Sequence, residues 1–465
     1  MIHTFLQIIM YVILIYTLIV ISTYSVMFII SFFYVRRLRD LHPKNPYDVL
    51  VETTFTKPIS ILVPAYNEEK GIIGSVSSLL SIQYPEYEVI VVNDGSRDQT
   101  LETLIDHFEL ILIDHEYKPE LQTKSVHAVY HSKLNPALYV VDKENGGKAD
   151  ALNVGINLSH FPYVCAIDAD SVLERDAFLK VMKPILDEDE EVVAIGGSVR
   201  IANGCRIEGG EVMEIGLSKS PLVILQVIEY LRAFLMGRIG LSRNNLLLIV
   251  SGAFGVFSKK WVKVVGGYAE TVGEDMELIV RLHRYICEEK LNLKIVYIPE
   301  PVCWTEAPES LSILRKQRTR WQRGLFESLW MHKKMIGNPH YGKIGLVSIP
   351  YFVFIELLGP IIEMMGYLLL IVFLIMGNLY VDFAIKLLLL NVLYGSILSA
   401  FAVTLEEWSF RKYPKLTHIW KLFLYSFTES FWYRPLTVIW RCEGLLQVLF
   451  RKKGWGDMVR KGVSS

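Results

Sequence analysis

The sequence has few cysteines and lacks the short motifs of several common site types. Its five cysteines are scattered without a CxxC pair or a metal-ligand spacing, so we expect no disulfide and a reducing compartment for the soluble part. Neither GxGxxG nor GxxxxGK[ST] occurs, and therefore neither a dinucleotide cofactor nor a P-loop is indicated. The net charge of −1 leaves no basic footprint for nucleic acid.

Long apolar runs set the expected organisation of the chain. Hydrophobic residues make up 52% of the 465 residues, which is high for a soluble protein. The segment from Phe5 to Val35 has no charged residue and exceeds the roughly 20 residues that span a bilayer. No small-residue cleavage site follows a short apolar core, so we expect an uncleaved anchor helix. Because three arginines follow between residues 36 and 39, the N-terminus should lie outside and residues 36–343 in the cytosol.

Two further apolar blocks, Ile344 to Met376 and Phe383 to Leu405, are long enough to cross a membrane. We expect their acids, Glu356 and Glu363, to face the helix bundle or a polar passage, because an acid that faces lipid is costly. The next segment, Leu416 to Phe450, must return to the cytosolic side, since basic residues lie on both sides of it. It forms either a hairpin or interfacial helices, and the sequence does not decide between them.

The middle of the chain begins with the pattern of a βαβ unit. Apolar runs predict strands at Lys57 to Asn67 and Glu88 to Asn93, with a helix from Glu68 to Ser81 between them. Asp94 closes the second strand at its carboxyl end, where a carboxylate can accept hydrogen bonds from a nucleoside. The same NDGS sequence is also typical of an ordinary turn.

The most informative stretch lies between residues 145 and 170. It predicts a loop at Gly146 to Lys148, a helix from Ala149 to Leu158 and a buried strand from Tyr163 to Ile167. The strand ends on Asp168 and Asp170, whose carboxylates leave the same face of an extended chain, at the edge where α/β sheets bind ligands. Paired hard oxygens suit Mg²⁺ or Mn²⁺, which takes further ligands from substrate phosphates. The alternative is a turn with two solvated acids.

Two basic positions are candidates for contact with phosphate. Lys148 opposes the dipole of the helix that it begins and is better tolerated beside an anion. In a long helix predicted from Ser310 to Lys334, the side chains of Gln317, Arg320 and Trp321 share a face. Arg320 can pair bidentately with phosphate, and the Trp321 ring offers a flat apolar surface for a sugar. The alternative is an interfacial helix whose basic residues meet anionic lipid.

Two other segments add candidate residues. Leu246 to Phe257 is a predicted strand interrupted at Ser251 and Gly252, either where a ligand approaches the backbone or at a bulge in the core. Asp275, in the sequence Gly-Glu-Asp before a predicted helix, can act as the general base that removes a proton from an acceptor hydroxyl. Acids in a first helical turn also complement the helix dipole without any further role.

The motifs VPAYNEE, NDGS, GGKADALN, DAD, GED and QRTRW follow one another in a recognisable order. From Lys57 to Trp321 the chain resembles the membrane-embedded, processive members of the inverting family 2 glycosyltransferases. These include cellulose, hyaluronan and chitin synthases and, closest in layout, poly-N-acetylglucosamine synthases. The resemblance implies a GT-A (Rossmann-like) α/β fold, with a cytosolic catalytic domain inserted between N-terminal and C-terminal transmembrane helices. One departure is Gly273, where cellulose synthases commonly have threonine.

The resemblance also implies a role for each motif residue. Asp275 falls where the family has its catalytic base, and Asp170 where it holds the metal ion, Mg²⁺ or Mn²⁺. The implied donor-binding residues are Glu68, Asp94, Lys148, Asp168 and Arg320. The implied acceptor-binding residues are Ser251, Gly252, Phe254, Glu274, Gln317 and Trp321.

The activity implied is inverting transfer from a UDP-sugar to a growing β-linked extracellular polysaccharide that is translocated across the membrane. Layout favours UDP-N-acetylglucosamine over UDP-glucose. The alternatives are single glycosylation of a membrane lipid and a catalytically silent membrane scaffold. Expected partners are the UDP-sugar, a polysaccharide or lipid acceptor, membrane lipids and an accessory membrane subunit, without nucleic acid. The expected location is the plasma membrane.

We therefore predict five parts along the chain. These are an N-terminal transmembrane anchor (1–36), a cytosolic GT-A catalytic domain (37–308), an amphipathic interfacial helix with QRTRW (309–343), C-terminal transmembrane and interfacial helices (344–450) and a basic cytosolic tail (451–465).

Overall fold

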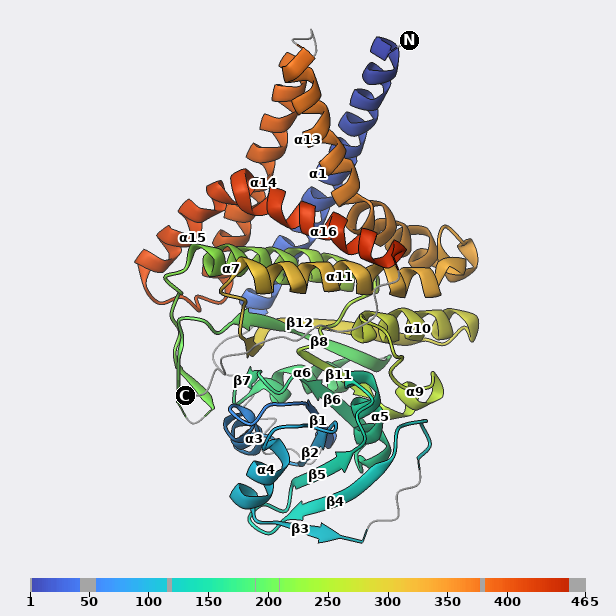
Figure 1. The fold of residues 1–465 in the computed structure, drawn as a ribbon, viewed down its shortest axis with the longest axis vertical. Coiled ribbons are helices and arrows are strands. Elements are labelled where there is room, and N and C mark those ends of the chain that lie inside the picture. Colours follow the sequence, from blue (N-terminus) through green and yellow to red (C-terminus); the bar gives the residue numbers. More distant parts are fainter. Residues whose placement is uncertain are drawn as a thin grey trace.

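A computed structural model describes residues 2–41, 56–114, 119–188, 190–208, 210–376 and 381–450. The predicted basic tail lies outside these ranges. Figure 1 shows an α/β part built on one large sheet at the bottom of the view. Long helices rise from it at the top, among them α1 (Ile2–Leu41), α13 (Gly359–Met376) and α14 (Val381–Ser409).

Ten strands of the described chain form one mixed sheet in the order β3-β4-β5-β2-β1-β6-β11-β8-β12-β7. The first strand pairs in parallel with β2 and β6, and β2 in turn with β5, so the carboxyl ends of these strands meet at one edge. The strand β11 runs antiparallel to both of its neighbours. The bounds are β1 (Ile59–Ala65), β2 (Tyr87–Asn93), β3 (Leu110–Ile113), β4 (Val126–Ser132), β5 (Leu138–Lys143), β6 (Tyr163–Ile167), β7 (Val172–Leu173), β8 (Glu191–Ile201), β11 (Phe254–Ser258) and β12 (Leu293–Thr305).

The apolar runs explain why these central strands form. The side chains of Ile59, Ile61, Leu62 and Val63 in β1 are fully buried, as expected for a parallel strand covered on both faces. Helices cover the sheet and lead into the membrane part. They are α3 (Ile72–Leu80), α4 (Thr100–Phe108), α5 (Lys148–Leu158), α6 (Ala177–Asp187), α7 (Pro221–Arg232), α8 (Ile239–Ser242), α9 (Lys259–Val264), α10 (Glu274–Glu288) and α11 (Leu311–Met331).

Two predicted element boundaries need correction. The helix expected from Glu68 begins only at Ile72, because residues 66–71 form a turn in which Asn67 has a positive φ of 57°. The strand expected from Leu246 begins only at Phe254, because the chain turns at Ser251, whose carbonyl accepts a hydrogen bond from the Phe254 N–H. Residues 246–253 therefore lie outside the sheet.

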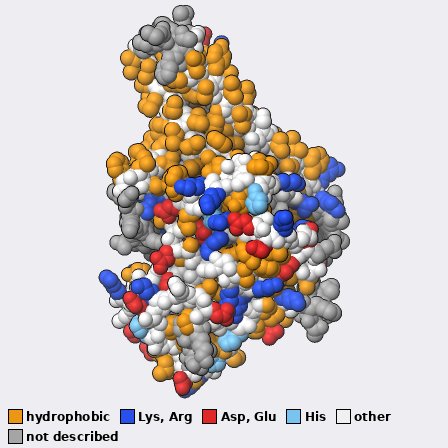
Figure 2. All heavy atoms as spheres, turned by 90° about the vertical axis from the view of Figure 1, so that its right-hand side faces the viewer, with side chains coloured by type: hydrophobic (Ala, Val, Ile, Leu, Met, Phe, Trp, Pro, Cys, Tyr) orange, Lys and Arg blue, Asp and Glu red, His pale blue; other side chains and the backbone are white. Residues whose placement is uncertain are grey.

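Three described helices are apolar and long enough to cross a membrane, Leu6–Arg39, Ile344–Ile375 and Val381–Ser409, with mean hydropathies of 2.3, 2.3 and 1.9. The predicted apolar blocks are confirmed. Figure 2 shows that hydrophobic side chains cover this upper part of the molecule, whereas charged side chains gather below it. A membrane would surround the hydrophobic part, because lipid-facing side chains must be apolar.

The segment after these helices forms α15 (Leu416–Thr428), a π-helical turn and α16 (Arg434–Leu449). Figure 1 shows both helices lying across the base of the long helices. There α16 packs along α11, and α15 packs against α7 and α14. This arrangement favours the interfacial alternative over a membrane hairpin.

The acids in the second span face protein, as predicted. The Glu363 carboxylate accepts hydrogen bonds from the Arg434 guanidinium at 2.8 and 3.0 Å. The Glu356 carboxylate accepts from the hydroxyls of Tyr24 and Tyr351 at 3.1 and 2.9 Å. These contacts join α13 and the helix before it to α1 and α16.

One buried ion pair joins the large sheet to the third span. Arg200 of β8 and Glu406 of α14 are 1% and 2% exposed, and their side chains form a salt bridge. Removing one member of a buried pair leaves an uncompensated charge and costs about 3–5 kcal/mol.

We therefore expect Glu406→Gln to lower the free energy of unfolding by about 3–5 kcal/mol, observed as a lower Tm in detergent. Asp187→Asn is the matched control, because the Asp187 side chain is 61% exposed and lies as far as 3.9 Å from the Lys183 ammonium. This change should alter the free energy of unfolding by no more than about 0.5 kcal/mol. Equal Tm values for the two variants would contradict the importance of this pair.

Candidate active site

One cavity of about 1560 Å³ opens at the carboxyl ends of β1, β2 and β6, beneath the helices of the membrane part. Segments far apart in the sequence meet in it. Every predicted site residue except Phe254 lines it, namely Glu68, Asp94, Lys148, Asp168, Asp170, Ser251, Gly252, Glu274, Asp275, Gln317, Arg320 and Trp321. The predicted convergence of the motifs is therefore observed, while the role of each residue stays a prediction.

The structure corrects the placement of Phe254. This side chain is fully buried in β11, and its ring packs against that of Phe178, with 6.0 Å between centroids. Alternation along the strand turns it into the core. A contact between Phe254 and an acceptor is not compatible with this position.

Asp94 holds the glycine loop in place. Its carboxylate accepts hydrogen bonds from the N–H groups of Gly146 and Gly147 at 2.9 and 2.7 Å. Beneath the loop, the buried Lys143 ammonium bridges Asp94 and Asp150 at 2.5 and 2.7 Å. Sequence reasoning missed Lys143 and Asp150: Lys143 lies outside the motifs, and Asp150, although part of GGKADALN, gave no sign that it pairs with Lys143. The structure thus gives Asp94 a positioning function, and its predicted contact with a nucleoside stays a prediction.

Both glycines of the loop are required by its geometry. Gly147 has a φ of +87°, which is unfavourable for a residue with a side chain. A methyl group added at Gly146 would lie 2.6 Å from the carboxyl carbon of Asp150. The loop therefore packs closely on the buried ion pairs and presents the N-terminus of α5 to the cavity.

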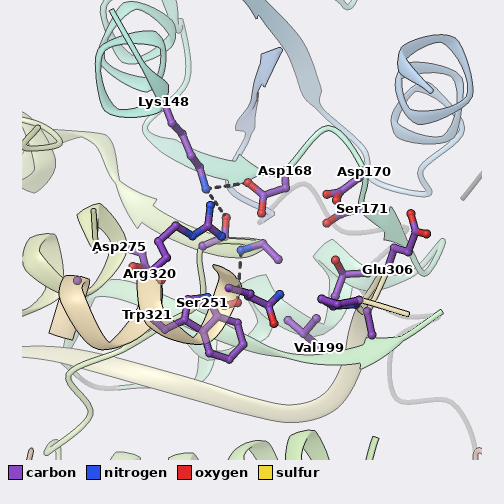
Figure 3. Close-up of a pocket in the computed structure, with 18 of the residues that line it drawn as sticks. Lys148, Asp168, Asp170, Ser171, Val199, Ser251, Asp275, Glu306, Arg320 and Trp321 are labelled. Atoms are coloured by element: carbon purple, nitrogen blue, oxygen red, sulfur yellow. Dashed lines mark hydrogen bonds and ion pairs between the residues drawn. The ribbon is translucent and has the colours of Figure 1, made fainter. Parts of the chain in front are cut away.

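Lys148, the first residue of α5, connects three segments of the site. Its ammonium nitrogen lies 2.7 Å from Asp168, 3.2 Å from Glu274 and 3.1 Å from the carbonyl oxygen of Gly252. Figure 3 shows Lys148 and Asp168 pointing toward each other. Burial opposes the charged form of the amine, but the carboxylates of Asp168 and Glu274 outweigh it and raise the pKa of Lys148. The sequence predicts an anion beside Lys148, and in this structure the carboxylates of Asp168 and Glu274 take that place.

The two aspartates after β6 do not continue an extended strand. The chain turns at residues 169–170, and the Ser171 N–H donates to the Asp168 carbonyl at 3.0 Å. Asp168 consequently points to Lys148, while Asp170 lies beside Ser171 in Figure 3. The expectation of two carboxylates on one strand face is wrong, although both line the cavity.

The donor set at Asp170 fits the predicted ion. Within the described residues, no group of three or more His, Cys, Asp or Glu side chains forms a protein-only metal cage. Mg²⁺ is commonly held by one or two carboxylates, with water and substrate phosphate as its other ligands. A single carboxylate in an open cavity matches that pattern.

Asp275 and Glu274 begin α10 on the opposite wall. A methyl group added at Gly252 would lie 3.4 Å from both the Asp275 carboxylate and the Lys148 ammonium, which shows how closely these groups surround that glycine. Glu274 is buried, and burial together with the neighbouring Asp275 raises its pKa, while the Lys148 charge opposes this rise. Asp275 is thus the more accessible acid of the pair.

The QRTRW motif lies on α11, and the Ser310 hydroxyl caps its first turn by accepting a hydrogen bond from the Ile313 N–H. Gln317, Arg320 and Trp321 all face the cavity, and Figure 3 shows Arg320 and Trp321 on the side of Asp275.

The lipid-facing alternative fails for two of the basic residues on α11. Arg318 and Arg323 are buried, and Arg318 donates to Glu229 at 2.7 Å. Arg315 instead pairs with Glu443 of α16, with its Nε 2.7 Å from the carboxylate. These contacts fix α11 against its neighbours.

The cavity extends beyond the predicted residues toward the membrane helices. Tyr24 of α1, Glu356 of the second span and Arg441 of α16 also line it. So does Arg238, which ends the π-helical segment Ala233–Arg238. No sequence signal indicated Arg238, because a single π-helical turn leaves no periodic pattern.

Comparison with known proteins agrees with this geometry. A family profile described as Glycosyl transferase family 2 matches residues 60–266, and one described as Chitin synthase matches residues 270–440. A poly-beta-1,6-N-acetyl-D-glucosamine synthase of Staphylococcus epidermidis is 32% identical over 275 residues, which cover 58% of this chain and 55% of that protein. The corresponding Staphylococcus aureus protein is 31% identical over 312 residues, 66% of this chain and 63% of that protein. The matched part is therefore less than two thirds of either relative.

A solved structure supports the fold. A mannosyltransferase from Pyrobaculum calidifontis, in complex with GDP-Man and Mn²⁺, superposes with a TM-score of 0.55 over 92% of this chain and 99% of that one, at 17% identity. The predicted GT-A fold is confirmed. Residues 60–266 match the Glycosyl transferase family 2 profile, and the chain resembles the poly-beta-1,6-N-acetyl-D-glucosamine synthases.

Proposed function

We propose that this protein transfers a sugar from a UDP-sugar to a growing β-linked polysaccharide and moves the product into the membrane. One observation carries the proposal: the cavity that contains Lys148, Asp275 and Trp321 continues to Tyr24 and Glu356 of the membrane helices. Such a cavity joins a site for transfer to a route for a chain-like product.

The donor end would be the cavity wall formed by Lys148, Asp170 and Arg320. Two cations there can offset the charge that develops on a departing diphosphate. A Mg²⁺ or Mn²⁺ ion on Asp170 would act as a Lewis acid on the same phosphates. The relatives are named as synthases of an N-acetyl-D-glucosamine polymer, so we propose UDP-N-acetylglucosamine as the donor.

The acceptor end would lie between Asp275 and Trp321. The oxygen of an acceptor hydroxyl attacks the anomeric carbon, the bond from that carbon to the UDP oxygen breaks, and Asp275 takes the hydroxyl proton. Attack opposite the leaving group inverts the configuration and gives a β-linkage from an α-donor. The exposed Trp321 ring offers an apolar surface on which a sugar can stack.

The membrane end favours export of the product. Tyr24, Tyr351, Glu356 and Arg441 line the cavity there, and hydroxyl, carboxylate and guanidinium groups can replace the hydrogen bonds that a sugar loses on leaving water. The arginines after the first span favour a cytosolic catalytic domain in the plasma membrane.

The test is incubation of membranes containing the protein with a panel of radiolabelled UDP-sugars, followed by linkage-specific glycosidases. The proposal predicts label from UDP-N-acetylglucosamine in a polymer. A single labelled sugar on lipid would instead support the alternative of lipid glycosylation. UDP binding without incorporation of any sugar would support a silent scaffold.

Replacement of the proposed base gives the first prediction. Asp275→Asn keeps the size of the side chain but cannot take a proton, so kcat should fall by about 10²- to 10⁴-fold, while the affinity for UDP stays nearly unchanged. Asp106→Asn, at an exposed position on α4, is the matched control and should keep full activity. A fully active Asp275→Asn variant would remove the assignment of the base.

Replacement of Lys148 gives a pH-dependent prediction. The pKa of Glu274 is already raised by burial, and Lys148 limits the rise, so Lys148→Met should raise it further above the unfolded value of about 4.3. When the pKa of a carboxyl group is higher in the folded than in the unfolded state, the protein loses stability as the pH rises toward and through the folded-state pKa. We therefore expect the Tm of the variant to lie further below that of the wild type at pH 8 than at pH 5.

The control for this measurement is Lys183→Met, since the Lys183 side chain is 27% exposed and its ammonium lies 3.9 Å from the exposed Asp187 carboxylate. Its Tm difference from the wild type should be small and equal at the two pH values. An equal difference for Lys148→Met would contradict the electrostatic coupling of Lys148 and Glu274.

A further inference from the structure

The loop that precedes the proposed base Asp275 packs on α11 through a contact between two glycines, Gly273 and Gly324. A methyl group added at Gly324 of α11 would lie 2.9 Å from the Cα of Gly273, and one added at Gly273 would lie 3.0 Å from the Cα of Gly324. Both neighbours are backbone atoms, which cannot move aside like the end of a flexible side chain. The two backbones therefore touch, and neither position has room for a side chain.

This contact explains why glycine stands at position 273. Gly273 immediately precedes Glu274 and Asp275 and is the last residue before α10. Any side chain at this position requires more distance between the loop and the opposing helix. Here the backbone of Gly324 fills the space that such a side chain needs.

Side chains of α11 hold the same loop on both sides of the glycine contact. The Glu327 carboxylate accepts a hydrogen bond from the Val272 N–H at 3.1 Å. The buried Ser328 hydroxyl lies 2.8 Å from the Gly324 carbonyl oxygen of its own helix and 3.3 Å from the Gly273 carbonyl oxygen, so it lies between the two glycines. One turn later, the His332 imidazole lies 3.0 Å from the buried carboxylate of Glu277 in α10.

These contacts and the cavity-facing motif belong to one face of α11. Gln317, Trp321, Gly324 and Ser328 follow at intervals of four, three and four residues, which keeps side chains on one side of a helix. The N-terminal half of this face lines the cavity, and its C-terminal half contacts the loop before Asp275.

We propose that Gly324, Glu327 and Ser328 are positioning residues that set the distance between the base Asp275 and the acceptor surface at Trp321. The inference rests on the proposed function, since it assigns these residues to the same transfer step. Glu327 and Ser328 do not line the cavity, and Gly324 lines it beside the loop. All three act through the place that they give to Asp275. A displacement of about 1 Å in such a group can cost about 10²-fold in rate.

The test compares Gly324→Ala with Gly366→Ala, another helical Gly-to-Ala change. Nothing lies within 4 Å of a methyl group added at Gly366 in α13, so this control should keep the wild-type kcat. Gly324→Ala should lower kcat at least about tenfold and leave the KM for the UDP-sugar and the Kd for UDP unchanged, because the added methyl would meet Gly273 and Val272 of the loop before Asp275, whereas Lys148 and Asp170 of the donor wall lie on other segments. Because unfolded protein also lowers the apparent kcat at constant KM, kcat is expressed per UDP-binding site, counted in the same titration that gives the Kd. A variant that is only less folded would lose binding sites and activity in equal proportion and would keep the wild-type kcat per site.

A second pair of variants serves if Gly324→Ala does not fold. Glu327→Ala removes the acceptor for the Val272 N–H and should show the same split, whereas Glu327→Gln keeps an acceptor and should restore most of kcat. Wild-type kcat in both Gly324→Ala and Glu327→Ala would overturn the inference. So would a loss of kcat matched by an equal loss of UDP affinity.

Sugar transfer by the wild-type protein distinguishes a failure of this inference from a failure of the proposed function. If the wild type transfers sugar and Asp275→Asn does not, the proposed function stands whatever Gly324→Ala shows. If the wild type transfers no sugar from any donor, the proposed function and this inference both fail.

Discussion

A partly buried ammonium group, that of Lys148, shared by separate parts of the chain, is the interaction on which the site depends. Lys148 contacts Asp168 after β6, Glu274 at the start of α10 and the Gly252 carbonyl. A charge out of water is tolerated only when it is paired and hydrogen-bonded. These partners therefore cannot separate without leaving uncompensated charge, and the donor wall and the base wall of the cavity are tied together. A diphosphate entering here would meet a cation already held in place.

Two further contacts hold Lys148 and the proposed base Asp275 in position. The buried Lys143, between Asp94 and Asp150, fixes the glycine loop from which α5 starts. The contact of Gly273 with Gly324 fixes the loop before Asp275 against α11. Since α11 packs on α16, and Arg200 pairs with Glu406 of the third span, the catalytic part and the membrane part share one set of contacts. This explains how a site for transfer can open directly toward the membrane helices.

Much of this could be predicted from the sequence, because the responsible signals are local or ordered. Apolar runs gave the central strands and the three spans, and the order of the motifs indicated the GT-A fold and the residues that meet in the cavity. The failures have physical causes. Phe254 turned into the core because strand alternation, not motif position, sets its direction. The turn after Ile167 separated Asp168 from Asp170. Lys143 and Gly324 were missed because each acts through a distant tertiary contact, and a single residue far along the chain carries no sign of its partner.

The central claim is that donor, metal ion and base meet in one cavity beneath the membrane helices. A structure of the membrane-embedded protein with UDP and Mn²⁺ tests it most directly. The account predicts the diphosphate between Lys148 and Arg320, the ion at Asp170 and the Asp275 carboxylate facing the open side of the diphosphate. A nucleotide bound outside this cavity, or an ion held by residues other than Asp170, would contradict it.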